Sequence, residues 1–361
     1  MSRNKKTKRI LFCASVIAGV LFAVGRDANA DFTFGEPVNL ESVIPVLDAA
    51  YDAIDCLSYD GLELFVDSKR PNGYGDWDIC VLRRTMTDSE WDSPENLGSA
   101  VNSPKLDTGA TITADGLEIY FISDRPGGHG RADIYMTKRA TKSEPWGPCV
   151  NLGPKVNGSA VDSGPWISPD GLELYFDSWR PDGYGKGDLW VTTREATTDS
   201  WAEPVNLGVA VNSPDYEGSP FISADGRMLF FHSDRQGGHG QADIWMTRRA
   251  SISDPWELPV NLGSRVNGAT DESYPRLSPD GRTIYFWSGR NENFQVPIVP
   301  ICDFNGDGIV DASDMCIVLD HWGESYPLCD VGPMPWGDGM VDVHDLIVLA
   351  GHLFEEAPLV E

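Results

Sequence analysis

The sequence predicts an all-β fold, a five-bladed β-propeller, followed by a small α-helical module. Two observations predict the propeller. An Asp-Gly pair recurs every 55 residues, with its glycine at positions 61, 116, 171, 226 and 281, and a block resembling Pro-Val-Asn-Leu precedes each pair. A third observation predicts the module: after residue 301 aspartates gather in two short loops, each followed by an apolar helical pattern.

The first 30 residues predict an export signal. A basic segment at 5–9 precedes an apolar run at 10–24, and Ala28-Asn29-Ala30 has the form of a cleavage site. The run of 15 apolar residues is shorter than the roughly 20 that a membrane-spanning helix needs. We therefore expect cleavage before Asp31, no membrane span in the mature chain, and a secreted protein, with the periplasm and the cell surface as alternatives.

The charge balance argues against two classes of binding partner. The chain has 28 Lys and Arg against 55 Asp and Glu, a net charge of -27, and cleavage of the signal would leave 22 against 54. Nucleic acids and anionic membranes attract proteins through Lys and Arg, so neither is an expected partner. The acidic balance fits cations instead, or simply solubility.

Residues 31–296 are predicted to form the propeller. In each repeat, such as "SPDGLELYFDSWRPDGYGKGDLW", Asp-Gly joins two alternating apolar runs, as in a β-hairpin. A Gly-rich loop, a third strand and the Asn-Leu strand follow, which makes four strands per unit. The block at 34–40 precedes the first unit, whereas the last unit ends after its third strand near 294–296. We therefore expect the N-terminal block to complete the fifth blade and leave no open sheet edge.

Charged residues recur at fixed distances from the Asp-Gly turn. The position nine before each glycine is acidic (Asp52, Asp107, Asp162, Glu217, Glu272), and the position nine after is arginine (Arg70, Arg125, Arg180, Arg235, Arg290). Positions symmetric about a hairpin lie opposite each other, so these residues are predicted to pair across strands rather than to form an open metal ring. A further recurring aspartate is expected to tie the Gly-rich loop to the same arginine (Asp78, Asp133, Asp188, Asp243).

These repeats resemble the bacterial WD40-like propellers that include the periplasmic propeller of the Tol system. That resemblance implies a platform for a protein or glycan ligand on the loop-rich face, more often than an enzyme. The alternative is a carbohydrate-active hydrolase with its carboxylates at the channel mouth. Catalytic residues would break the repeat symmetry, and nearly every acidic residue near that mouth follows the pattern, so we assign no catalytic residue.

After a connector at 297–301, residues 302–356 contain the first aspartate-rich loop, "DFNGDGIVDASD". Its oxygen-bearing residues have the spacing of an EF-hand Ca²⁺ loop, and Gly308 stands where such a loop turns sharply. The predicted ligands are five side chains and one backbone carbonyl: Asp303, Asn305, Asp307, Asp311, Asp314, and the carbonyl of Ile309.

The second loop, "GDGMVDVHD", is a degenerate copy of the first. It supplies ligands at positions 5, 7, 9 and 12 (Asp338, the carbonyl of Met340, Asp342, Asp345), whereas positions 1 and 3 are Met334 and Trp336. Asp330 lies four residues too early for position 1 and would substitute only if the longer loop folds back. Cys302 and Cys329 precede the two loops at matching points, which indicates an internal duplication; the sequence leaves their pairing, and that of Cys316, open.

This tandem of calcium loop plus single helix resembles a type I dockerin. The resemblance implies Ca²⁺ as cofactor and a cohesin-like protein as partner, often in polysaccharide-degrading systems. It also implies that partner recognition falls on four positions after the ninth loop residues: Ala312, Ser313, Val343 and His344. The sequence as a whole therefore predicts a secreted, non-catalytic binding protein docked through Ca²⁺. The alternatives are a dockerin-borne hydrolase and an interaction protein that stays in the periplasm.

Overall fold

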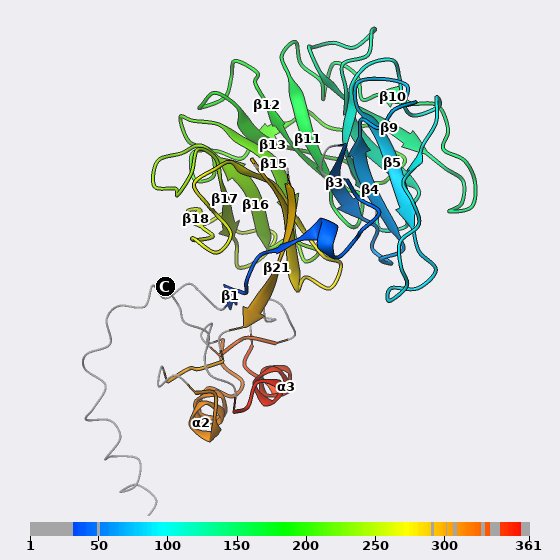
Figure 1. Cartoon of the computed structure of the whole chain (residues 1–361). Coiled ribbons are helices and arrows are strands. Elements are labelled where there is room, and N and C mark those ends of the chain that lie inside the picture. The colour runs from blue at the N-terminus through cyan, green and yellow to red at the C-terminus, as the bar shows by residue number, and fades with distance from the viewer. Residues whose placement is uncertain are drawn as a thin grey trace, which may run out of the picture. The chain divides into compact units, whose positions relative to one another are not determined.

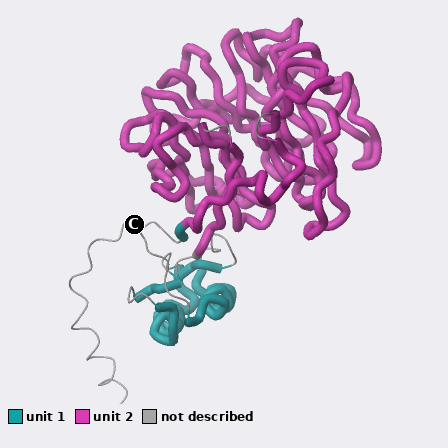
Figure 2. Tube along the Cα trace, viewed as in Figure 1, with its two compact units in different colours: residues 1–33, 300–361 teal, residues 34–299 magenta. Residues whose placement is uncertain are grey.

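The computed structural model describes residues 32–48, 51–289, 292–300, 302–305, 309–325, 329–332 and 340–354 (Figure 1). The predicted signal peptide lies outside these residues, as do Asp307, Asp338 and Arg290. The chain divides into two compact units (Figure 2). One comprises Phe34–Val299, and the other comprises Pro300–Glu361 together with residues up to Thr33.

The larger unit is a five-bladed β-propeller, which confirms the predicted fold class (Figure 1). Blades 1 to 4 are antiparallel four-stranded sheets whose strands follow chain order. Blade 1 holds β3 (Asp52–Leu57), β4 (Glu63–Ser68), β5 (Asp78–Arg83) and β6 (Glu95–Asn96); blade 2 holds β7 (Asp107–Ile112), β8 (Glu118–Ser123), β9 (Asp133–Lys138) and β10 (Val150–Asn151). Blade 3 holds β11 (Asp162–Ile167), β12 (Glu173–Ser178), β13 (Asp188–Thr193) and β14 (Val205–Asn206); blade 4 holds β15 (Glu217–Ile222), β16 (Met228–Ser233), β17 (Asp243–Arg248) and β18 (Val260–Asn261).

The fifth blade closes the ring with the N-terminal segment, as predicted. It contains β19 (Glu272–Leu277), β20 (Thr283–Ser288) and β21 (Glu292–Pro300), together with β1 (Phe32–Phe34) and β2 (Val38–Asn39). Val38 and Asn39 pair antiparallel with Gln295 and Phe294 of β21. A short 3-10 helix, η1 (Leu40–Ser42), follows β2 and leads toward the first blade. The outer edge of the last sheet is thus paired by the start of the domain.

The Asp-Gly turns have the geometry that their sequence predicts. In blade 3, Gly171 has a φ of +72°, a left-handed conformation that glycine adopts without a Cβ penalty. The Ser168 hydroxyl donates to Asp170 and accepts from the N–H of Glu173, so the turn and the start of β12 are joined through one side chain. The same Ser-x-Asp-Gly arrangement recurs in blade 5 around Gly281.

The recurring aspartate of the Gly-rich loop holds that loop, but its second partner differs from the prediction. Asp78 accepts hydrogen bonds from the N–H groups of Tyr74 and Gly75, as expected. Its other partner is the Asn96 side chain at 2.8 Å, rather than the arginine that we predicted. Asn96 in turn accepts from Asn102, which bonds both backbone groups of Ile79. This network recurs in blades 2, 3 and 4 and explains the repeated Asn-Leu-Gly motif.

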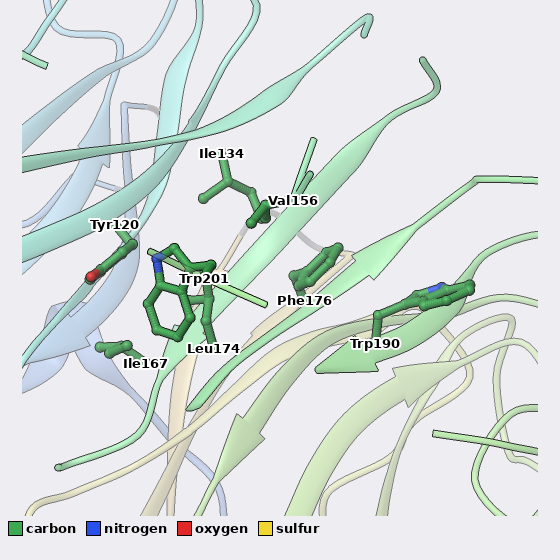
Figure 3. Packing of buried hydrophobic residues seen from close by; sticks show 8 residues of the cluster. All are labelled: Tyr120, Ile134, Val156, Ile167, Leu174, Phe176, Trp190 and Trp201. Atoms are coloured by element: carbon green, nitrogen blue, oxygen red, sulfur yellow. The ribbon is translucent and has the colours of Figure 1, made fainter. Parts of the chain in front are cut away.

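Apolar side chains fill the space between neighbouring blades. Figure 3 shows one such cluster, formed by blades 2 and 3 and the segments beside them: Tyr120, Ile134, Val156, Ile167, Leu174, Phe176, Trp190 and Trp201. Trp201 meets Tyr120 edge to face at 6.0 Å between ring centroids, and the guanidinium of Arg194 lies 4.4 Å from the Trp201 ring. Each blade is therefore stabilised mainly by burial against its neighbours.

The smaller unit contains two short helices, α2 (Ala312–Asp320) and α3 (Val343–Gly351). Its core contains residues from the segments around both aspartate-rich loops and from both helices: Cys302, Phe304, Val310, Val318, Cys329, Val331, Val341 and Leu349. Cys316 is exposed, and it and Cys329 are free thiols, so no disulfide joins the three described cysteines of this unit. Within the described part of the chain, neither helix nor any other is long and apolar enough to cross a membrane.

Candidate functional site

The recurring acids and arginines form ion pairs in all four blades where both residues are described. The Asp162 carboxylate accepts from Arg180 at 2.7 Å, and Glu217 accepts from Arg235 at 3.0 Å. Asp52 pairs with Arg70, and Asp107 pairs with Arg125. The carboxylate-bearing side chains are fully buried, and each arginine also donates to a backbone carbonyl, such as that of Val156. The prediction of cross-strand pairs is confirmed, and each of these carboxylates is neutralised by its own cation.

A different set of polar residues lies around the axis of the propeller. The first strands of neighbouring blades contact one another and surround that axis. The guanidinium of Arg276 on β19 lies 4.8 Å from the ring of Trp166 on β11, although blades 5 and 3 are not neighbours. The Arg276 side chain therefore reaches across the channel. Its Nε donates to the backbone carbonyl of Asp55 on β3, so three blades meet through one buried arginine.

Asp55 and Asp67 form a carboxyl pair beside Arg276. Asp55 is buried and Asp67 is partly buried, and the two side chains lie within hydrogen-bonding reach of each other. Burial raises the pKa of Asp55 to about 6, and burial together with the Asp55 charge raises the pKa of Asp67 well above its ordinary value. The two carboxyls therefore share a proton near neutral pH, because two buried charges at this distance repel.

The opposite side of the channel carries a second acid with aromatic neighbours. Asp177 accepts hydrogen bonds from the hydroxyls of Ser163 and Tyr216 and from the N–H of Ser219. The ring of Tyr216 lies 5.3 Å from that of His232, whose pKa burial lowers to about 4. His232 is therefore neutral at pH 7, and it can donate or accept a hydrogen bond without changing the local charge.

Tyr274 shows that the channel contains accessible space. This residue exposes 42% of its surface, yet burial of its hydroxyl among nearby acids raises its pKa to about 12. Residues of this region also carry buried polar atoms that have no hydrogen-bond partner in the described protein: Asp55 Oδ2, Thr111 Oγ1, Trp166 Nε1 and His232 Nδ1. Buried polar groups normally have a hydrogen-bond partner, so water or a small polar ligand is expected among them.

Our prediction that the acids near the channel follow the repeat pattern is wrong for this axial cluster (Asp55, Asp67, Asp177, His232 and Arg276). The position of Asp67 holds Asp, Ile, Asp, His and Trp in the five repeats, and that of Arg276 holds Cys, Thr, Trp, Phe and Arg. A comparison of the repeats for their differences would have found these residues. The hydrogen-bonded Asp55–Asp67 pair is closer than the roughly 5 Å that a glycosidase acid and nucleophile require, and an arginine lies beside it.

The first aspartate-rich loop of the smaller unit is organised by the carboxylate at its twelfth position. Asp314 accepts hydrogen bonds from the N–H groups of Phe304 at 2.7 Å, Asn305 at 3.1 Å and Asp311 at 2.9 Å. Asp311 caps α2 by accepting from the N–H of Ser313. Asp303 and Asp314 are buried, with 2% and 0% of their surfaces exposed. Those predicted ligands that the structure describes therefore lie in one short, hydrogen-bonded segment.

The second loop repeats this geometry with Asp345 at the twelfth position. Asp345 accepts from Val331 at 2.7 Å, from Gly332 at 2.8 Å and from Asp342 at 2.6 Å. Val331 directly follows Asp330, as Phe304 directly follows Asp303, so Asp330 has the same backbone relation to Asp345 as Asp303 has to Asp314. Among the described residues, which omit Asp307 and Asp338, no group of three His, Cys, Asp or Glu side chains is arranged to hold a metal ion.

The residues predicted to recognise a partner lie at the starts of the two helices. Ala312 and Ser313 begin α2, Val343 and His344 begin α3, and all four are exposed. Further apolar side chains are exposed on the same helices, among them Leu319 on α2 and Ile347 on α3, at 54% and 64%.

Comparisons with known proteins leave the family of the chain undetermined. No protein-family model matches it. An uncharacterized protein of Agrobacterium fabrum is 28% identical over 231 residues, which cover 58% of this chain and 65% of that protein. The chain thus spans less than two thirds of the curated relative that it matches.

Solved propellers that are similar to the chain include TolB-type proteins and glycosidases. A putative TolB from Agrobacterium tumefaciens is 19% identical, covering 72% of this chain and 79% of its own with a TM-score of 0.44. TolB from Acinetobacter baumannii is 15% identical, covering 70% and 56% with a TM-score of 0.43. An α-L-arabinofuranosidase from Lactobacillus brevis is 11% identical, covering 72% and 94% with a TM-score of 0.47.

Proposed function

We propose that the protein is an exported, non-catalytic binding protein, whose propeller holds a protein or glycan ligand and whose C-terminal unit is a calcium-dependent docking module of the dockerin type. Its partner would be a cohesin-like protein, and its setting an extracellular polysaccharide-degrading system. The observation that supports the proposal is an arrangement found in both loops. Asp314 and Asp345 each accept hydrogen bonds from the backbone N–H groups of the two residues that follow an aspartate.

The donor set of the C-terminal unit fits Ca²⁺. All of its predicted ligands are oxygens, which hard cations prefer. Each loop contains two buried aspartates, Asp303 and Asp314 in the first and Asp330 and Asp345 in the second. A cation would offset the cost of burying these charges, and its binding would therefore stabilise the folded unit. Exposed residues at the starts of α2 and α3 would remain available for the partner.

Calorimetry with and without EGTA tests the calcium part of the proposal. We expect chelation to lower or abolish the transition of the C-terminal unit and to leave the transition of the propeller unchanged. Asp314→Asn should weaken Ca²⁺ binding, whereas Asp320→Asn, an exposed residue at the end of the same helix, should not. A calorimetric trace unchanged by EGTA would contradict the proposal.

The propeller's ligand can be sought separately from the docking module. A glycan array and a pull-down, each with the intact protein in Ca²⁺, distinguish a glycan ligand from a protein ligand. Product release from plant or microbial polysaccharides would favour the alternative, a dockerin-borne hydrolase. Because Asp55 and Asp67 share a proton at short range, Asp177 is the axial candidate for one of the two carboxylates of such an enzyme. Asp177→Asn would then abolish the activity.

A further inference from the structure

The joint between the last and first blades differs from the first two joints of the ring in one chemical group. A buried or half-buried arginine follows the third strand in blades 1 to 4 (Arg84, Arg139, Arg194, Arg249). Each lies over a tryptophan of the same blade, at 4.2 to 4.4 Å from the ring. Each also donates from Nε to the carbonyl of its Asp-Gly glycine, at 2.7 or 2.8 Å. The repeat therefore fixes the guanidinium in one place and one orientation.

At the joints between blades 1 and 2 and between blades 2 and 3, this arginine meets a glutamate of the preceding blade. Arg139 binds Glu63, and Arg194 binds Glu118 at 3.2 Å. A tyrosine completes the group in blade 2, where the Tyr120 hydroxyl donates to Glu118 at 2.7 Å. In blade 3 the Tyr175 hydroxyl donates to Glu173 at 2.8 Å, and Arg249 of blade 4 lies within hydrogen-bonding reach of Tyr175.

At the closing joint the arginine and the tyrosine are present, but the glutamate is not. The blade preceding Arg84 in the ring is blade 5, in which Tyr285 takes the tyrosine position and Thr283 takes the glutamate position. Within the described residues, Arg84 has no ion pair. Burial lowers its pKa, and the nearest charged or ionisable groups are Tyr285 and the exposed Asp88. Two donors thus converge where the first two joints of the ring have a carboxylate.

A cavity of about 500 Å³ opens in front of these donors. Its volume is within the range of small-molecule sites, roughly 300–1,000 Å³. Arg84, Tyr285 and Arg276 supply its polar wall, and apolar side chains supply most of the remainder, among them Leu40, Ile44, Leu57, Leu64 and Trp91. Asp88 and Glu90 are exposed residues of the lining and would face solvent beside a bound anion.

We propose that this closing-joint pocket binds a small organic acid. The ligand's carboxylate takes the place of the missing glutamate and accepts from Arg84 and Tyr285, and its apolar body lies against the aliphatic wall and Trp91. Because a guanidinium binds a planar carboxylate through two parallel hydrogen bonds, an acid is favoured over its neutral amide. This site shares Arg276 with the axial cluster, but Arg84, Tyr285 and the apolar wall lie outside that cluster and outside the calcium loops, so it goes beyond the proposed function.

Isothermal titration of the full mature chain in Ca²⁺ tests the pocket, with benzoate and hexanoate as probes and benzamide as the neutral control. We expect both acids to bind and benzamide not to bind. Arg84→Gln should weaken benzoate binding by about tenfold or more, since a hydrogen bond to a charged group is lost. Arg131→Gln, which removes an exposed arginine elsewhere in the propeller, should leave it unchanged.

Thr283→Glu gives an independent readout. The introduced carboxylate should bind Arg84 and Tyr285 as Glu118 binds Arg194 and Tyr120, so it should abolish benzoate binding and raise the melting temperature of the propeller. Circular dichroism checks that the variant folds, and Tyr285→Phe serves as a milder second variant that should also weaken benzoate binding. Equal binding of benzoate and benzamide, or full binding by Arg84→Gln, would overturn the proposal.

Discussion

The ion pairs between the first and second strands should stabilise the propeller unequally, according to how much water reaches each arginine. In blade 3, Asp162 is fully buried and Arg180 exposes 16% of its side chain. Asp162→Asn keeps the size of the side chain but leaves a largely buried cation without its anion. Breaking a buried pair in this way costs about 3–5 kcal/mol, and the partial exposure of Arg180 favours the lower end, about 3 kcal/mol.

Blade 1 provides the matched comparison within the same molecule. Arg70 exposes 36% of its side chain, so water can solvate its guanidinium when the anion is removed. Exposed pairs contribute roughly 0–1 kcal/mol and buried pairs several, so Asp52→Asn should cost an intermediate amount, about 1–2 kcal/mol. The two substitutions change the same chemical group at the same repeat position. The arginines differ in solvent access, and Arg70 donates to Asp52 from both Nε and a terminal nitrogen, whereas Arg180 donates to Asp162 from a terminal nitrogen alone.

Urea unfolding followed by tryptophan fluorescence measures both costs, with Ca²⁺ present so that the C-terminal unit stays constant. A double-mutant cycle with Arg180→Gln isolates the pair from the other bonds of Asp162, such as that with the N–H of Gly158. We expect the denaturation midpoint to fall with an unchanged slope. An Asp52→Asn cost equal to that of Asp162→Asn, or a coupling energy below about 1 kcal/mol for the blade 3 pair, would refute the reasoning.

Two further predictions concern the axis of the propeller. The pKa of Asp55 is raised from 3.8 to about 6, so between these pH values the folded chain keeps a proton that the unfolded chain releases. Stability should therefore fall as pH rises through this window, and Asp55→Asn should flatten the profile and be more stable at pH 8 by on the order of 3 kcal/mol, as pH-dependent unfolding would measure. Gly164→Ala should destabilise the propeller more than Gly153→Ala in thermal unfolding. Both glycines have positive φ, but a Cβ at Gly164 would lie 2.4 Å from an Asp177 oxygen, whereas nothing lies within 4 Å at Gly153.

The fold could be predicted because its determinants are repeated. A turn that needs positive φ, such as that at Gly171, is visible five times, so coincidence is excluded by the spacing alone. The closure by the N-terminal block followed from counting strands, and β2 pairs with β21 as the count required. The hydrogen-bond partner of Asp78 was predicted incorrectly because Asn96 and the nearby arginine are both compatible with a loop-binding aspartate. Only the path of the backbone decides which of them is within reach.

The axial cluster could not be predicted by the same method, because its residues differ from repeat to repeat. Asp55 and Asp67 are 12 residues apart in the sequence and meet because β3 and β4 pair, with Asp67 opposite Ala53 and Asp55 at a register shift. Arg276 joins them from the far end of the chain.

The degenerate calcium loop presents the opposite case. Spacing alone placed Asp330 out of register, whereas the bonds from Val331 and Gly332 to Asp345 give it the backbone position that Asp303 has in the first loop.

Repetition and variation therefore mark different kinds of residue in this propeller. The network around Asp78 and its equivalents, and the ion pairs with Arg70 and its equivalents, fix the backbone of each blade by the same bonds. Once the backbone is fixed in this way, side chains that face the axis or a joint can change without loss of the fold. A position where a repeated partner is replaced, as at Thr283, then leaves a group such as Arg84 in its original orientation but without its original anion. Such replaced partners are where a repeat protein can acquire a ligand, because the binding group is already held in place by bonds that it shares with blades 2 to 4.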